Sequence, residues 1–317
     1  MKKDVSFLSA DGKTKIHTVM WLPDDSTPVA VIQLIHGMLE YIDRYEEFAQ
    51  YMTENGFAVV GHDHLGHGDS VNSPDDYGYI ADCADPANIL VRDIHHVRCA
   101  AMKHFPKLPY FILGHSMGSY LLRMYLSQHG EGLDGAIIMG TGQQPDFMTN
   151  FGLSLIKLKS KIKGDRTAAP EIRDLSYNAY YKKFDLFGEN PENSWLSKNV
   201  DDVISYYKDP KCTFIFSYNA YKALLSAVKY DNQPKNIDRI PKNLPLLLIS
   251  GSDDPVGDCG KAVKAVYSRY VKAGITDITC NLIEGDRHEI LREPDRADTF
   301  EYILDWITLH VAKQHCE

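Results

Sequence analysis

Short apolar runs that alternate with longer amphipathic stretches constrain the fold of this chain more than any other feature. The runs lie at 29–35, 57–60, 110–113, 135–139, 244–249 and 278–283, and stretches with helical periodicity lie near 44–55, 88–104, 117–129, 260–273 and 295–313. Runs with few polar residues are typical of strands buried on both faces, as in a parallel sheet covered by helices. The pattern predicts an α/β chain with a mostly parallel, doubly wound central sheet and helices on both faces.

Two segments depart from this alternation. Residues 4–22 indicate two strands around Asp11-Gly12, a pair that suits a hairpin turn. Between Met139 and Leu244 the alternation stops, and the segment is rich in Tyr, Lys and Asn with helical spacing in patches. We predict that residues 145–236 form an inserted helical cap, or lid, and that residues 1–144 and 237–317 together form the core.

The net charge, the apolar runs and the cysteine spacing indicate which binding partners and which cellular location to expect. The formal net charge of −9 gives no attraction to a phosphate backbone, so we expect no binding to nucleic acid. The N-terminus lacks the apolar stretch of a signal peptide, and the longest apolar runs are too short to cross a bilayer, so we expect a cytoplasmic protein. The cysteines form no CxxC pair, which favours reduced thiols over a disulfide framework or a zinc site. They are Cys83, Cys99, Cys212, Cys259, Cys280 and Cys316.

A serine between two glycines follows the apolar run that ends at Leu113. The sequence FILGHSMGSY places Gly114-x-Ser116-x-Gly118 between that run and a helical stretch. In a strand-turn-helix setting the turn exposes the hydroxyl, and side chains at either glycine would collide with neighbouring backbone. An ordinary turn serine is the alternative. The setting favours Ser116 as a nucleophile, with the backbone N–H of Met117 at the helix start facing an oxyanion.

A serine hydroxyl needs a base and an acid that orients the base. Asp253 and Asp254 follow the run at 244–249, and His288 follows the run at 278–283. The aspartates alone also suit a helix N-cap, and a lone loop histidine is often only a surface residue. Because Ser, Asp and His appear in this order at successive strand ends, we predict that they form a catalytic triad. His115, the neighbour of Ser116 on the turn, is expected to point away from the hydroxyl.

The loop after the first long apolar run offers a second oxyanion donor. Ile35-His36-Gly37-Met38-Leu39 places the N–H of Met38 directly after a glycine at a strand end. We predict that Met38 and Met117 form the oxyanion hole and that His36 braces the loop.

With these residues in hand, the sequence resembles the α/β-hydrolase superfamily and, within it, the monoacylglycerol lipase and lysophospholipase group of serine hydrolases. The resemblance implies the α/β-hydrolase fold and hydrolysis of esters with an apolar acyl group. Its Gly-x-x-Asp spacing selects Asp254 as the orienting acid and makes Asp253 a bystander. The matching stretches are His36-Gly37-Met38-Leu39-Glu40 with Arg44-Tyr45, then Gly61-His62-Asp63-His64-Leu65-Gly66-His67-Gly68-Asp69-Ser70, then Gly114-His115-Ser116-Met117-Gly118, and Gly251-Ser252-Asp253-Asp254 with His288.

Two positions depart from the pattern of this group. Leu39 stands where related lipases usually have glycine. Leu291 stands where monoglyceride lipases commonly have a second histidine, which is associated with the glycerol end of the substrate. The expected substrates therefore include monoacylglycerols, lysophospholipids and short- or medium-chain esters.

Other readings of the motifs remain open. His62, His64 and His67, with Asp63 among them, suggest a hydrolytic metal site, because His and Asp are common zinc ligands. A ligand-binding relative without turnover is a further alternative. The serine mechanism itself requires no metal and no cofactor.

The cap contains a basic amphipathic segment, residues 147–163. Its apolar side chains recur at helical spacing and alternate with lysines. One alternative is a contact with a membrane interface. The other, which the alternating lysines and the acidic chain favour, is a cap helix packed over the pocket with its lysines in water.

Overall fold

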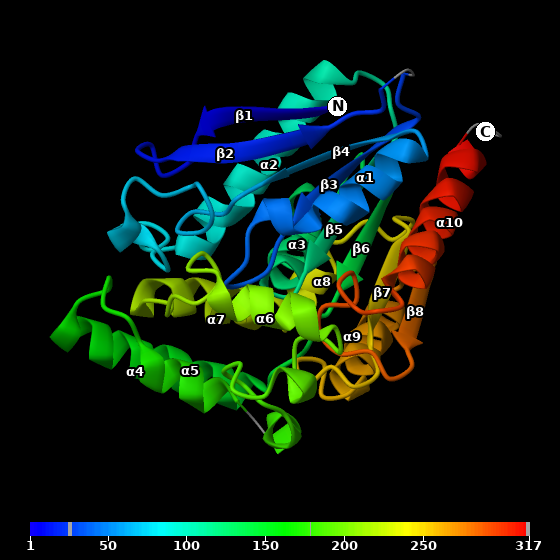
Figure 1. The fold of residues 1–317 in the computed structure, drawn as a ribbon. Helices are drawn as coiled ribbons and strands as arrows, with labels where there is room; N and C mark the ends of the chain where they lie inside the picture. Colours follow the sequence, from blue (N-terminus) through cyan, green and yellow to red (C-terminus); the bar gives the residue numbers. More distant parts are fainter. Residues whose placement is uncertain (25–26, 178, 315–317) are drawn as a thin grey trace.

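The computed structural model describes residues 1–24, 27–177 and 179–314 (Figure 1). Within these residues eight strands form one sheet in the order β1-β2-β4-β3-β5-β6-β7-β8. Strands β3 to β8 pair in parallel, whereas β1 and β2 form an antiparallel hairpin that pairs with β4. The strands are β1 (Lys2–Leu8), β2 (Lys15–Trp21), β3 (Ala30–Ile35), β4 (Phe57–His62), β5 (Tyr110–His115), β6 (Gly135–Met139), β7 (Leu246–Gly251) and β8 (Ile278–Ile283). The predicted hairpin and mostly parallel sheet are confirmed.

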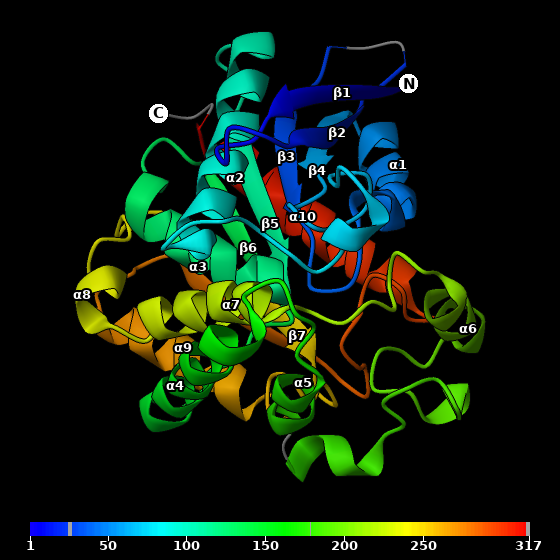
Figure 2. The same ribbon diagram turned by 90° about the vertical axis from the view of Figure 1, so that its left-hand side faces the viewer.

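Helices cover both faces of this sheet, as the alternation predicts (Figure 2). Successive side chains of a strand point to opposite faces. Val31 and Ile35 of β3 therefore pack in one core cluster with residues of α2, α3 and α9, whereas Ile32 and Leu34 pack in another with residues of α1 and α10. The helices are α1 (Glu46–Glu54), α2 (Pro86–His104), α3 (Met117–His129), α9 (Lys261–Lys272) and α10 (Arg296–Gln314).

The chain between β6 and β7 is mainly helical and lies on one side of the sheet (Figure 1). Its α-helices are α4 (Asp146–Lys163), α5 (Pro170–Ser176), α6 (Val200–Lys208), α7 (Tyr218–Asp231) and α8 (Pro234–Ile237). Helix α7 joins this segment to the core, because it packs against α2 and α3 as well as against α4. We keep the name cap for residues 145–236, whose boundaries stay a prediction.

Helix α4 turns its apolar stripe outward. Phe147, Phe151, Leu158 and Ile162 are 73%, 64%, 59% and 75% exposed, whereas Ile156 on the opposite side of the helix is buried. The expectation that the apolar side of this helix packs over the pocket with its lysines in water is therefore wrong for these four side chains, whereas Leu155 packs partly buried against the core. The physical reason is that α4 has apolar or small residues on both sides, and its contact with α7 uses the other side.

The described cysteines form no disulfide with one another. Cys83, Cys99, Cys212, Cys259 and Cys280 are free thiols, and Cys316 lies outside the described residues. No helix in the described part of the chain is long and apolar enough to cross a bilayer.

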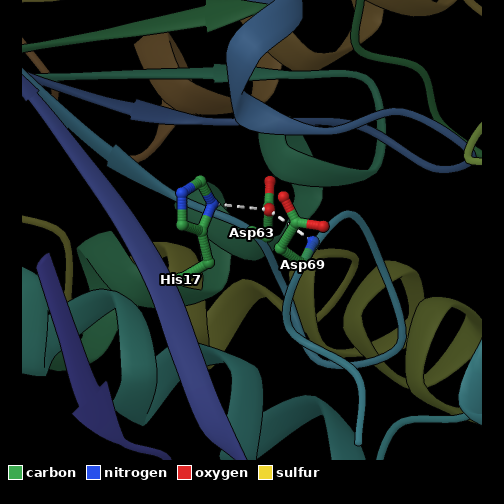
Figure 3. Close-up of side chains that lie close together, drawn as sticks. All are labelled: His17, Asp63 and Asp69. Carbon is green, nitrogen blue, oxygen red and sulfur yellow. Dashed lines mark hydrogen bonds and ion pairs between the residues drawn. The ribbon is translucent and has the colours of Figure 1, made fainter. Parts of the chain in front are cut away.

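A buried carboxylate holds the N-terminal hairpin to the core (Figure 3). Asp63, just after β4, accepts hydrogen bonds from the N–H groups of Ile42 at 2.7 Å and Asp69 at 2.8 Å. His17 of β2 places its Nδ1 2.9 Å from Asp63 and its Nε2 3.2 Å from Asp4. The hydrogen bond to Asp63 raises the pKa of His17 to about 9 and outweighs the effect of burial. Protonated His17 therefore ties β1 and β2 to the loop after β4.

This ion pair predicts a pH-dependent contribution to stability. Because the folded-state pKa of His17 is raised from 6.5 to about 9, its stabilising effect is complete below pH 6.5 and is lost as pH rises through about 9. In urea unfolding from about pH 6 to about pH 10, the free-energy difference between wild type and His17→Gln should shrink with increasing pH. His104→Gln, at an exposed position, is the control. A difference that grows with pH would contradict the pairing.

Candidate active site

Ser116 occupies a strained turn between β5 and α3. Its backbone has φ 52° and ψ −120°, a conformation that residues other than glycine rarely adopt. A Cβ at Gly118 would lie 2.1 Å from the carbonyl oxygen of Ile35, and one at Gly114 would lie 2.5 Å from that of Gly118. The predicted steric need for both glycines is confirmed. Ser116 is partly exposed, although its neighbours on both sides are buried.

The structure brings the three residues of the predicted triad together. His288 places its Nε2 2.8 Å from the hydroxyl oxygen of Ser116 and its Nδ1 3.0 Å from a carboxylate oxygen of Asp254. Asp254 follows β7 and His288 follows β8, so the two loops meet at the same edge of the sheet as the turn after β5. Given these partners, the Nδ1–H donates to Asp254 and Nε2 accepts from the hydroxyl.

The two neighbouring aspartates have different surroundings. The side chain of Asp253 is 47% exposed and pairs with Lys183 at 3.5 Å, whereas Asp254 is fully buried. Asp254 also accepts hydrogen bonds from the N–H of Val256 at 2.9 Å and the hydroxyl of Ser250 at 3.1 Å. Burial raises the pKa of the Asp254 carboxyl, but the His288 imidazole and these hydrogen bonds outweigh burial, so the net shift is downward. Asp254 is thus held as a carboxylate.

Met117 directly follows Ser116, and the loop that carries Met38 contacts the turn of Ser116. Met117 is the first residue of α3, where N–H groups have no partner within the helix and the helix dipole favours negative charge. The loop with Met38 touches the turn, because a Cβ at Gly37 would lie 2.9 Å from the Cβ of Ser116. Leu39 has φ 59°, in the left-handed region that glycine adopts freely. This conformation explains why a glycine suits the position of Leu39.

A buried carboxylate that the sequence analysis did not single out links the loops of this site. Glu40 accepts hydrogen bonds from the N–H of Gly37, from the Tyr45 hydroxyl at 3.0 Å and from Nδ1 of His115 at 3.0 Å. The Nε2 of His115 lies 3.1 Å from the carbonyl oxygen of His288. Burial opposes charge on both side chains, but their pairing lowers the pKa of Glu40 and raises the pKa of His115. His115 therefore points away from the Ser116 hydroxyl, as expected, and supports the His288 backbone.

His36 braces the loop between β3 and α1. Its Nε2 accepts a hydrogen bond from the N–H of His64 at 2.9 Å, and its Nδ1 lies 2.8 Å from the carbonyl oxygen of Gly37. Both neighbours belong to loops at the edge of the site. The geometry agrees with the bracing role expected for His36.

The rings of the three histidines of the alternative metal site lie near one another, with centroids 5.0 Å apart for His62 and His64 and 6.3 Å apart for His64 and His67, but their nitrogen atoms do not all come within 4.8 Å of one another. His62, His64 and His67 are buried, and burial lowers the pKa of His62 and of His67 to about 3. Within the described residues, the potential ligand atoms that lie within 4.8 Å of one another belong instead to His17, Asp63 and Asp69 (Figure 3). The Asp63 oxygens there already accept backbone N–H groups, which favours the ion pair described above.

The comparisons with known proteins agree with this geometry. The family model described as "Serine aminopeptidase, S33" matches residues 26–295. The chain belongs to this family. The human monoglyceride lipase is 26% identical over 311 residues, which cover 96% of this chain and 90% of that protein.

Solved structures give the same result. A thermostable carboxyl esterase from Bacillus coagulans, in complex with glycerol, superimposes with a TM-score of 0.88 at 28% identity and covers 98% of this chain and 99% of that one. A monoglyceride lipase from Saccharomyces cerevisiae superimposes with a TM-score of 0.74 at 19% identity, covers 97% of this chain and 94% of that one, and supports the fold alone. The predicted α/β-hydrolase fold and the resemblance to the monoacylglycerol lipase group are confirmed.

The crowding around Gly118 gives a test of the turn. Gly118→Ala should lower the free energy of unfolding by about 2 kcal/mol or more, because the new Cβ meets backbone that cannot move aside easily. Gly152→Ala on α4 is the control, since its Cβ meets only the end of the flexible Leu225 side chain. Equal stability of the two variants in urea unfolding would contradict the close approach of α3 and β3.

Proposed function

We propose that this protein is a serine hydrolase that cleaves carboxylic esters with an apolar acyl group through an acyl-enzyme, without a metal. The observation that carries the proposal is the hydrogen-bonded line from Ser116 through His288 to the buried Asp254, with distances of 2.8 Å and 3.0 Å. Nucleophile, base and orienting acid in hydrogen-bond reach are the requirements for activating a serine hydroxyl.

The proposed reaction has two halves. In the first, His288 accepts the proton of Ser116 as its oxygen attacks the ester carbonyl, and Asp254 stabilises the imidazolium that forms. The N–H groups of Met38 and Met117 donate to the oxyanion, a type of contact whose loss costs about 2.7–4 kcal/mol in other hydrolases. His288 then protonates the leaving alcohol. In the second half, water attacks the acyl-enzyme and restores Ser116.

The substrate class rests on the relatives and on position 291. Relatives that align over nearly the whole chain include monoglyceride lipases. This similarity supports the proposal that the substrates are lipid esters with an apolar acyl chain. Leu291 is buried and packs in the core with Ile290, so this chain offers an apolar side chain at that position. We therefore propose monoacylglycerols, lysophospholipids and short- or medium-chain esters as the substrates to compare in a panel.

Labelling with a fluorophosphonate probe tests the nucleophile. The wild type should become covalently labelled and should hydrolyse nitrophenyl esters, whereas Ser116→Ala should lose labelling and about a thousandfold or more of the rate. An unlabelled wild type would indicate a ligand-binding relative. Loss of activity with a chelator and recovery with zinc would indicate metal chemistry instead.

The neighbouring aspartates provide a matched control. Asp254→Asn should lower kcat by about a thousandfold or more, because the amide cannot stabilise the imidazolium. Asp253→Asn changes the same functional group one residue away, on an exposed side chain. Equal effects of the two substitutions on kcat would contradict the assignment of Asp254.

We also propose that helix α4 makes a transient contact with a membrane surface that contains anionic lipid. The exposed stripe of Phe147, Phe151, Leu158 and Ile162 supplies apolar area. At 100° per residue, Lys157 and Lys161 lie on one side of this stripe, and Lys159 and Lys163 on the other. Apolar side chains flanked by lysines are the pattern of helices that lie in the plane of an interface.

Vesicle flotation tests this contact. The wild type should float with vesicles of phosphatidylcholine and phosphatidylglycerol, and added salt should weaken binding. Phe151→Asp combined with Ile162→Asp should weaken binding about tenfold or more, because burial of apolar area is lost. Leu309→Asp changes a similarly exposed apolar residue on α10 and is the control. No flotation of the wild type, or equal loss in the control, would contradict the proposal.

A further inference from the structure

A tryptophan of the cap stacks on the histidine of the candidate triad. The indole ring of Trp195 lies 5.1 Å from the imidazole ring of His288, centroid to centroid, with 29° between the planes. The imidazole also contacts the His115 ring at 4.7 Å and 39°. His288 is therefore in contact with one ring from the core and one from the cap.

The cap segment around Trp195 is bonded to the chain on both sides of His288. The N–H of Glu289 donates to the carbonyl oxygen of Leu196 at 2.7 Å. The guanidinium of Arg287 donates to the carbonyl oxygen of Ser194 at 2.6 Å. Because residues 287 and 289 both hold the segment, the position of the indole ring is fixed relative to the imidazole between them.

A buried glutamate also links the cap segment to the loop of His288. Glu293 accepts hydrogen bonds from the Ser197 hydroxyl at 2.8 Å and the Lys198 N–H at 2.7 Å. Its other oxygen accepts the N–H of Arg287 at 2.7 Å. One carboxylate thus binds the cap segment and the His288 loop together.

We infer that cap residues 194–198 are a fixed part of the active site and that Trp195 is a positioning residue that acts through His288. The inference rests on the proposed serine mechanism. In that mechanism Nε2 of His288 serves first the Ser116 hydroxyl and then the leaving oxygen, so the plane of the ring must be held while Nδ1 stays on Asp254. The indole face holds this plane. It also attracts the positive charge that the imidazole carries in the transition state.

Substitution of Trp195 separates this role from substrate binding. Trp195→Leu should lower kcat about 5- to 30-fold, the range expected for loss of a partly buried cation–π contact, with KM changed less than about 3-fold. Trp195→Phe keeps an aromatic face and should stay within about 3-fold of the wild-type kcat. Phe187→Leu, an exposed aromatic residue elsewhere in the cap, is the matched control. Thermal melting checks that each variant is folded.

The outcomes are distinct. An unchanged kcat in Trp195→Leu, or an equal loss in the Phe and Leu variants, overturns the inference. Fluorophosphonate labelling separates it from the proposed function: an unlabelled wild type contradicts the serine mechanism, whereas normal labelling with unchanged kcat in Trp195→Leu overturns only the role of Trp195.

Fluorinated tryptophan gives a test that preserves the shape of the residue. Fluorine withdraws charge from the indole face and weakens its attraction for a cation. Protein with increasingly fluorinated tryptophan should show a stepwise fall in kcat, and the Trp195→Phe variant, which keeps Trp21 and Trp306, should show none. A flat response in the wild-type background overturns the inference even where Trp195→Leu fails to fold.

Discussion

The buried pair of Glu40 and His115 is the interaction on which the geometry of the site depends. Glu40 holds the loop of Met38 through the N–H of Gly37, and His115 extends from the turn of Ser116 to the backbone of His288. Removing His115 would leave the buried Glu40 carboxylate beside Arg44 at 3.8 Å but without its hydrogen-bonded imidazole, and removing Glu40 would take from the buried His115 the carboxylate that favours its protonated form. Breaking such a buried pair is more costly than losing a surface pair. The loop of Met38, the turn of Ser116 and the loop of His288 are therefore one connected unit.

The sequence predicted this unit only in part, for physical reasons. The strands and the proximity of the three candidate triad residues were predictable because carboxyl ends of parallel strands meet at one edge, so residues that follow such strands come together. Asp254 could be chosen over Asp253 only from the spacing of the resemblance. The structure supplies the reason, since Asp253 is half-exposed and pairs with Lys183, whereas Asp254 is buried beside Ser250.

The cap was the least predictable region. The apolar spacing in α4 indicated a helix, but it could not say which side contacts α7, because both sides carry apolar residues. Trp195 gave no signal, since its relation to His288 depends on hydrogen bonds between segments that are distant in the chain. The donors of these bonds include backbone N–H groups, which every residue but proline has.

The left-handed conformation of Leu39 has a consequence for the timing of catalysis. A glycine at this position would give the loop many conformations before substrate arrives, whereas a leucine restricts them and accepts about 1–2 kcal/mol of backbone strain. The loop then loses its conformational freedom when the protein folds, and not each time a substrate binds. In the proposed mechanism, a loop restricted by Leu39 orders the N–H of Met38 before substrate binds.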